Sequence, residues 1–166
     1  MKLTILILCL AAQFLVFACS RASPGEGKAT TSVVPVGPVH VLPAAGGDVA
    51  TLVRAALVEA RRQHRRLLVY VGASFSTSCV AFKKAARHGE LDHVLPGLTV
   101  LEFDSDHDLE RLAAAGYDGR HLPVFVLPRA DGRASPHLVV AAADDGKVGA
   151  VTGPLLRALL ERDPRS

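Results

Sequence analysis

The residue best suited to covalent chemistry in this sequence is Cys79, which directly follows Ser76, Thr77 and Ser78. Because a predicted helix begins at Cys79, the exposed amides and the positive end of the helix dipole would stabilise its thiolate. Such a thiolate can be oxidised or can form a mixed disulfide. In the alternative interpretation, Cys79 is a small, half-buried hydrophobe that stays inert, because apolar surroundings favour the neutral thiol. The sequence leaves both interpretations open.

The other two cysteines, Cys9 and Cys19, precede the predicted folded region. Residues 1–18 place Lys2 ahead of an almost uninterrupted apolar stretch, which predicts a signal peptide. A retained membrane helix is the alternative, because about 20 apolar residues span a bilayer and this stretch is only slightly shorter. The end of the leader resembles the lipobox of bacterial lipoproteins, through Leu15-Val16-Phe17-Ala18-Cys19.

The lipobox resemblance implies that Cys19 is lipidated and becomes the N-terminus of a protein anchored on the periplasmic side of the cell envelope. A secreted or signal-anchored protein is the alternative. After processing, Cys79 is then the only free thiol of the mature chain. Thiol–disulfide exchange needs a second thiol to break the mixed disulfide, so Cys79 alone cannot cycle within one molecule. Cys19 could pair with Cys79 only if the leader were retained and the intervening segment folded back.

Residues 19–47 are predicted to form a flexible tether. Four of the ten prolines lie in this segment, together with many Gly, Ser, Thr and Ala residues. Such a composition buries too little apolar surface to fold by itself. A short first strand near residues 39–42 is the one regular element that it could contain.

From Asp48 onward, helical and strand-like hydrophobic patterns alternate. Asp48 is predicted to cap the first helix, and a turn of polar residues precedes the second. The predicted elements, in chain order, are a helix after Asp48, a strand at 67–71, a helix at 79–95, a strand at 98–103, a helix from Ser105 to Gly116, strands at 124–127 and 138–141, and a final helix opened by Thr152 and Pro154.

This order predicts an α/β fold, a mixed sheet with helices on both faces. The Asp131-Gly132 pair marks a reversal, so the last two strands are expected to pair antiparallel. Functional sites in such sheets lie beyond the carboxyl ends of the parallel strands. The turn from Ser74 to Cys79 occupies that position.

The segment Ala73-Ser74-Phe75-Ser76-Thr77-Ser78-Cys79, with Leu122-Pro123 opening a later strand, resembles the thioredoxin family. The resemblance covers roughly residues 48–163 and implies a thioredoxin-like domain. Phe75 stands where the family has an aromatic residue before its Cys-x-x-Cys motif, and Pro123 where it has a cis proline. The family's attacking cysteine is replaced by Ser76, and its buried acid by Tyr70.

Two functions follow as expectations. In the first, a tethered domain in extracytoplasmic thiol/disulfide biology binds or holds polypeptides without catalysing dithiol exchange. The resemblance implies that the polypeptide lies in a groove lined by Phe75 and Pro123, and that Leu122 pairs with its main chain. In the second, Cys79 serves a single-thiol redox enzyme, of the peroxidase or mixed-disulfide type. Ser76 and Cys79 also resemble the Thr-x-x-Cys motif of peroxiredoxins, for which Arg120 would be the arginine.

Other functions are disfavoured by composition and spacing. With 19 basic and 16 acidic residues, a net charge of +3 and 5% aromatic residues, the chain lacks the basic surface typical of nucleic-acid binding. None of the seven histidines has the spacing of a zinc site, so neither a metal nor a cofactor is expected. His121 is more consistent with a solvated loop than with a partner of Cys79. The expected partners are extracytoplasmic polypeptides or thiol proteins, and the membrane through the N-terminal lipid.

Overall fold

The computed structural model describes residues 37–163. The predicted signal peptide, the lipidation residue Cys19 and most of the tether lie outside these residues. Within them, none of the helices combines the length and the apolar character that crossing a membrane requires.

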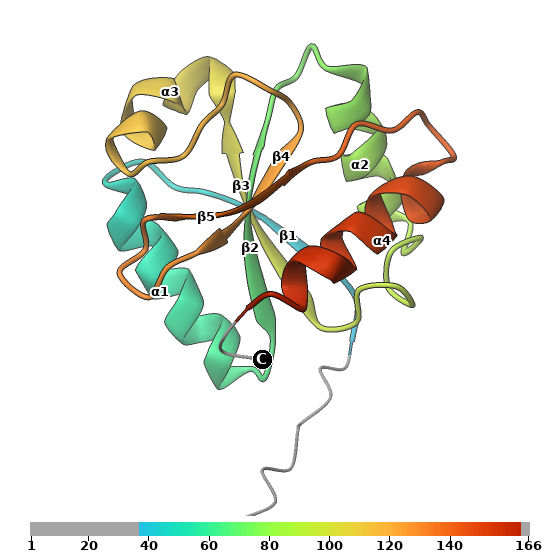
Figure 1. Cartoon of the computed structure of the whole chain (residues 1–166), viewed down its shortest axis with the longest axis horizontal. Coiled ribbons are helices and arrows are strands. Elements are labelled where there is room, and N and C mark those ends of the chain that lie inside the picture. The colour runs from blue at the N-terminus through green and yellow to red at the C-terminus, as the bar shows by residue number, and fades with distance from the viewer. Residues whose placement is uncertain (1–36, 164–166) are drawn as a thin grey trace, which may run out of the picture. The chain divides into compact units, whose positions relative to one another are not determined.

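Five strands form one mixed sheet in the order β1-β3-β2-β4-β5 (Figure 1). The strands β1, β3 and β2 are parallel, whereas β4 is antiparallel to β2 and β5 is antiparallel to β4. The predicted reversal at the Asp131-Gly132 pair is therefore confirmed. The bounds are β1 His40–Pro43, β2 Arg66–Gly72, β3 Leu98–Asp104, β4 Val124–Pro128 and β5 Ala134–Val140.

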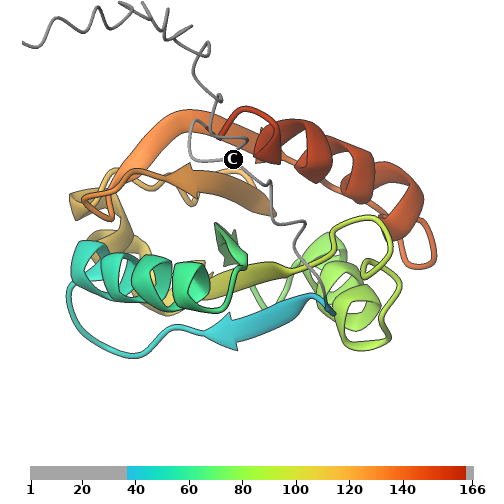
Figure 2. The ribbon, with the colours of Figure 1, turned by 90° about the horizontal axis from the view of Figure 1, so that it is seen from below.

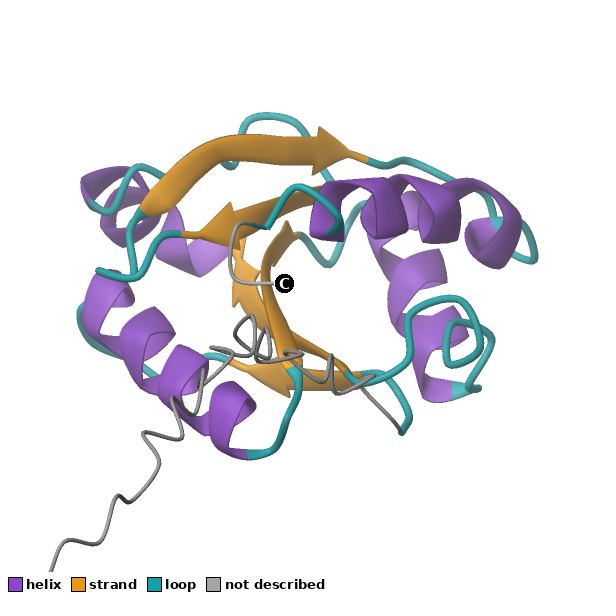
Figure 3. Cartoon of the chain, turned by 60° about the horizontal axis from the view of Figure 1, so that its bottom comes forward, coloured by secondary structure: helices purple, strands orange, loops and turns teal. Residues whose placement is uncertain are grey.

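Four helices cover the two faces of the sheet, which confirms the predicted α/β class with a thioredoxin-like arrangement. Figures 1 and 3 show α1 and α3 on one side of the sheet and α2 and α4 on the other. The turned view in Figure 2 separates the helices of the two layers again. The bounds are α1 Val49–Arg62, α2 Thr77–Arg87, α3 Ser105–Ala114 and α4 Val148–Leu160.

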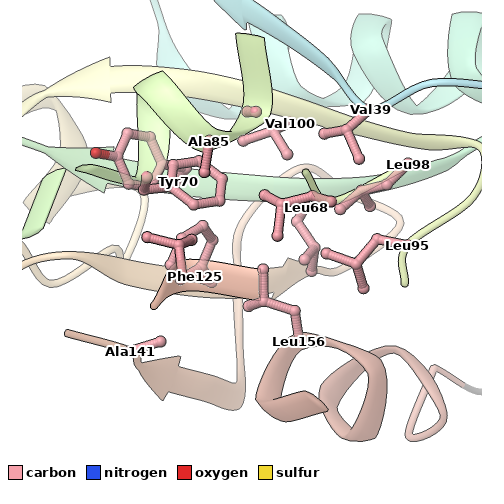
Figure 4. Close-up of a cluster of buried hydrophobic side chains, with 14 of the residues drawn as sticks. Val39, Leu68, Tyr70, Ala85, Leu95, Leu98, Val100, Phe125, Ala141 and Leu156 are labelled. Carbon is pink, nitrogen blue, oxygen red and sulfur yellow. The ribbon is translucent and has the colours of Figure 1, made fainter. Parts of the chain in front are cut away.

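Each face of the sheet has its own hydrophobic core, because successive residues of a strand point to opposite faces. In β2, Leu68 and Tyr70 pack with residues of α2 and α4, whereas Val69 and Val71 pack with residues of α1 and α3. Figure 4 shows part of the first core, where Tyr70 and Leu68 of β2 lie near Phe125 of β4. Burial on both faces explains the continuous apolar run in β2.

The short strand expected near residues 39–42 is present as β1 and pairs with β3. It therefore extends the sheet upstream of residue 48. Arg65 helps to hold this edge, because its guanidinium donates hydrogen bonds to the carbonyl oxygens of Pro38 and Leu98 and to Thr99 Oγ1.

The boundaries of two predicted helices are wrong. The helix expected at 79–95 is α2, which begins at Thr77 and ends at Arg87, because Gly89 adopts a positive φ of 75° that breaks helical geometry. The helix expected from Ser105 begins there, as α3, and its cap is Asp104. The Asp104 carboxylate accepts a hydrogen bond from the Asp106 amide, and the Asp108 carboxylate accepts one from the Asp104 amide.

The second helix with a wrong boundary is α4, which begins at Val148 and contains Pro154 in its interior. Proline lacks the amide hydrogen that a helix interior needs, so the sequence favours a later start. Packing decides otherwise, because Val148 and Thr152 are buried and fix the first turn against the sheet. In addition, β5 begins at Ala134, earlier than the expected 138, because pairing with β4 resumes directly after the turn.

Candidate functional site

The predicted motif lies at the beginning of α2, beyond the carboxyl end of β2, as the fold class requires. Ser76 is the N-cap residue: its Oγ accepts a hydrogen bond from the Cys79 amide at 3.4 Å, and its carbonyl accepts one from the Val80 amide at 3.0 Å. A hydroxyl at this position satisfies an amide that the helix leaves unpaired. Ser76 therefore holds the turn of α2 that carries Cys79.

Cys79 is a free thiol with an exposed fraction of 0%. It belongs to the core between the sheet and α2, where it packs with residues such as Phe82 and Phe125. The sequence left open whether this cysteine is a reactive thiolate or a buried hydrophobe. Full burial favours the hydrophobe, because a peroxide or a protein disulfide must touch the sulfur to react.

Tyr70, which stands where the resemblance to thioredoxins implies a buried acid, is fully buried. Its ring packs against Phe82 and Phe125, with centroids 5.0 and 5.1 Å apart. Burial raises the pKa of Tyr70 far above its ordinary value, and the neighbouring Cys79 thiol raises it further. The hydroxyl has no conventional hydrogen-bond partner, since a thiol is only a weak acceptor. Tyr70 thus stays neutral and cannot take over the proton-carrying role of a carboxylate.

Gly72 makes room for the Tyr70 hydroxyl. A Cβ atom at residue 72 would lie 2.2 Å from that oxygen and 2.5 Å from Cζ of the same ring. Figure 4 shows the hydroxyl pointing away from the aliphatic part of the core, toward one end of β2. The pairing of Tyr70 with Gly72 was not recognised in the sequence, although a glycine two residues after a strand tyrosine is the signal that could have indicated it.

Beside the motif lies an open cleft of ≈ 550 Å³. The exposed ring of Phe75 forms one wall, with an exposed fraction of 75%, and Leu122 lies in another. The structure thus brings together three of the predicted site residues, Phe75, Ser76 and Leu122. Cys79 and Pro123 are buried and do not line the cleft, so the expectation that Pro123 lines it is wrong. The full lining is Phe75, Ser76, Thr77, Ser105, Asp106, Leu109, Gly119, Arg120 and Leu122.

The Leu122–Pro123 peptide bond is cis, as the resemblance implies for Pro123. The Leu122 side chain is partly buried and packs against both cores. Its main-chain amide and carbonyl take part in none of the hydrogen bonds among residues 37–163, whereas the Pro123 carbonyl accepts one from the Ala141 amide. Leu122 thus presents an unused peptide group next to the cleft.

A second hollow of ≈ 280 Å³ shares Phe75 and Thr77 with the cleft and includes Val80 of α2 in its lining. At its rim, Lys84 Nζ and Asp145 Oδ2 form an ion pair at 2.6 Å. This pairing raises the pKa of Lys84 and lowers that of Asp145. Phe75 therefore lines both hollows.

The charged residues of the cleft are Arg120 and Asp106. Arg120 donates from Nε and a terminal nitrogen to Asp118, at 2.7 to 3.1 Å. These bonds lower the pKa of Asp118 to about 2, so the pair stays ionised at neutral pH. In the peroxiredoxin-like alternative, Arg120 would be the peroxide-binding arginine, and in the structure it engages Asp118. His121 is exposed on the same loop, whereas Cys79 is buried.

No group of three or more metal-binding side chains occurs within the part of the chain that the structure describes. Among known proteins, no family model, no curated protein and no solved structure matches this chain. The α/β fold is therefore shown by the structure alone, and the relation to the thioredoxin family stays a resemblance of motif and topology.

Proposed function

We propose that this domain binds an extended segment of another polypeptide in the cleft between Phe75 and Leu122, and that it does not turn over disulfides. The observation that carries the proposal is the unused peptide group of Leu122, located beside an open cleft. An extended segment can add to such a group by main-chain hydrogen bonds, as in other cases of strand addition.

The apolar surface around the cleft supports the same proposal. Phe75, Val80 and Leu109 are all substantially exposed, with exposed fractions of 75%, 47% and 49%. Aromatic side chains at the centre of a binding surface contribute disproportionately to affinity. Phe75 is therefore the expected anchor, with a side chain of the bound segment in each flanking hollow.

The state of the motif argues against catalysed dithiol exchange. A serine hydroxyl cannot form the mixed disulfide that begins such a reaction, and Ser76 is engaged as the cap of α2. Cys79 is buried. This burial also makes the alternative, a single-thiol redox enzyme, the weaker proposal.

The cellular setting is part of the proposal. The apolar leader over residues 1–18 and the lipobox ending at Cys19 support export and lipid anchoring on the periplasmic side of the cell envelope. The expected partners are extracytoplasmic polypeptides, including thiol proteins.

Binding is tested by recording NMR spectra of the isotope-labelled protein while unlabelled extended peptides are added. The amide signals of Leu122 and Phe75 are expected to shift first, and Phe75→Ala is expected to weaken binding about tenfold or more. Val58→Ala is the matched control, because Val58 is an exposed apolar residue of α1 outside both hollows. Equal affinities of the two variants would contradict the proposal.

Catalysis is tested by following insulin reduction in the presence of dithiothreitol, together with peroxide consumption. The protein is expected to accelerate neither reaction. Turnover of insulin disulfides at a rate near that of an intact dithiol enzyme would overturn the proposal. Peroxide consumption that disappears in Cys79→Ser would instead establish the single-thiol alternative.

A further inference from the structure

We infer that the cleft selects polypeptide segments that carry a lysine or arginine side chain, and that Asp106 is the residue that determines this specificity. The inference rests on the proposed function, because it names the chemical class of segment that the same cleft accepts. The argument begins from the charges that line the cleft.

Asp106 is the charged residue of the cleft lining that has no ion-pair partner among residues 37–163. The other, Arg120, is paired with Asp118. The Asp106 carboxylate forms no ion pair with any lysine, arginine or histidine of the described chain, and its one side-chain contact is a long hydrogen bond of 3.5 Å from Ser74 Oγ. The nearby Asp108 does have such a partner, because its Oδ1 atom forms an ion pair with Arg111 Nη2 at 2.8 Å. The cleft therefore carries an excess negative charge.

The apolar walls of the cleft suit the remainder of a cationic side chain. Lysine and arginine bury their methylene stems against apolar surface and keep the charged head in water. Leu109 and Leu122 offer that surface, and the exposed Phe75 ring can attract a cation through its face. A carboxylate and an aromatic ring on one cleft thus favour the same ligand.

The N-terminal ends of α2 and α3 also lie at the cleft, and their partial positive charges favour anions. At α3, the Asp104 carboxylate accepts a hydrogen bond from the Asp106 amide and offsets the dipole. At α2, the Ser76 hydroxyl caps part of the exposed amide surface. A helix end carries about half an elementary charge. Because Asp104 offsets the α3 end, the full charge of Asp106 stands against the half charge of the α2 end alone and decides the preference.

The test measures fluorescence anisotropy of labelled peptides with the intact chain in mild detergent. The peptides share the sequence Gly-Ser-Val-X-Val-Ser-Gly, with lysine, arginine, norleucine or glutamate at X. Lysine and arginine are expected to bind about fivefold more tightly than norleucine, the upper range for an exposed ion pair, and glutamate more weakly. This preference is expected to shrink in 1 M salt, where charges are screened within about 3 Å.

Asp106→Asn is expected to abolish the preference, and Asp106→Lys to reverse it toward glutamate. Glu110→Gln is the matched control, because Glu110 is an exposed acid of the same helix that does not line the cleft, and it should keep the wild-type preference. Equal binding of all four peptides to the wild-type chain would overturn this inference and leave the proposed function standing. Absence of binding for every peptide would contradict both.

A further outcome concerns the chain's own basic residues upstream of residue 37. If replacing Arg21 and Lys28 by glutamine created peptide binding that the wild-type chain lacks, the occupant of the cleft would be the chain's own tether. That result would contradict a separate polypeptide as the partner.

Discussion

Tyr70 is the single residue that most clearly separates this site from a dithiol enzyme. It places a neutral hydroxyl next to Cys79, at a position where the resemblance implies a carboxylate. The hydroxyl is buried without a conventional hydrogen bond, and an unpaired buried donor costs free energy. Three predictions at the residue scale test this description.

Tyr70→Phe is expected to raise the free energy of unfolding by about 1 kcal/mol, because it removes an unpaired buried hydroxyl. Urea titrations monitored by circular dichroism measure this change. Tyr117→Phe is the control with the opposite sign, because the Tyr117 hydroxyl donates to the Gly132 carbonyl at 2.9 Å. A loss of stability in Tyr70→Phe would mean that the hydroxyl has a strong partner.

Tyr70→Phe is also expected to change how the free energy of unfolding depends on pH. The pKa of Tyr70 is raised in the folded state, whereas an unfolded tyrosine ionises near a pH of about 10. Above that pH only the unfolded state releases this proton, so wild-type stability is expected to fall as the pH rises. Tyr70→Phe should lack this part of the decline. Parallel stability curves for both proteins between pH 8 and 11 would contradict the assignment.

Gly72→Ala is expected to destabilise the domain by about 1–3 kcal/mol, because the new Cβ would overlap the Tyr70 ring and hydroxyl. Thermal or urea unfolding measures the effect. Gly46→Ala is the matched control, since a Cβ there has no atom within 4 Å. The double variant Gly72→Ala/Tyr70→Phe should lose less free energy of unfolding than Gly72→Ala alone, because the atom nearest to the new Cβ is gone. If the effects of the two single substitutions simply added up in the double variant, the proposed clash would be contradicted.

At the scale of elements, α2 joins the cleft to the core. Its first turn places Ser76 and Thr77 in the cleft lining, and its inner face places Cys79 and Phe82 in the core. The cap residue thus fixes both the cleft wall and the depth of the thiol.

Ser76→Ala is expected to lower the free energy of unfolding by about 0.5–1 kcal/mol, at the modest end for an N-cap because the hydrogen bond is long. Ser76→Asn should restore most of the stability, since asparagine caps equally well. Ser78→Ala serves as the control within the same turn. If Ser76→Asn were as unstable as Ser76→Ala, the serine would have a role other than capping.

At the scale of the whole molecule, the fold encloses Cys79 and leaves the neighbouring cleft open. Side chains from β2, α2 and β4 surround the thiol, whereas the cleft is lined from the beginnings of α2 and α3 and from the loop before β4. Binding and thiol chemistry are therefore expected to be separable.

Alkylation of Cys79 by iodoacetamide is expected to be at least about a hundredfold slower in the native protein than in urea, because only opened molecules expose the sulfur. Peptide mass spectrometry locates the label. The introduced thiol of Val58→Cys, at a position with 63% exposure, reports the rate for an accessible cysteine. Labelling of native Cys79 as fast as this control would show that the thiol is open to reagents.

Local pattern was enough to predict the α/β class, the antiparallel end of the sheet and the position of the Ser76-to-Cys79 turn. These features depend on residue periodicity and on the order of elements along the chain. The same reasoning misplaced the start of α4, because a proline is a strong local signal while the burial of Val148 is not visible along the chain.

By itself, the sequence determined that one cysteine in the predicted folded region lacks its motif partner, since this is a matter of residue identity. Only the tertiary structure decided that Cys79 is sealed from solvent, that Tyr70 fits because Gly72 has no side chain, and that Asp106 lines the cleft without a cation. Burial and charge pairing join residues from separate elements, so they emerge only when the sheet and its helices pack together.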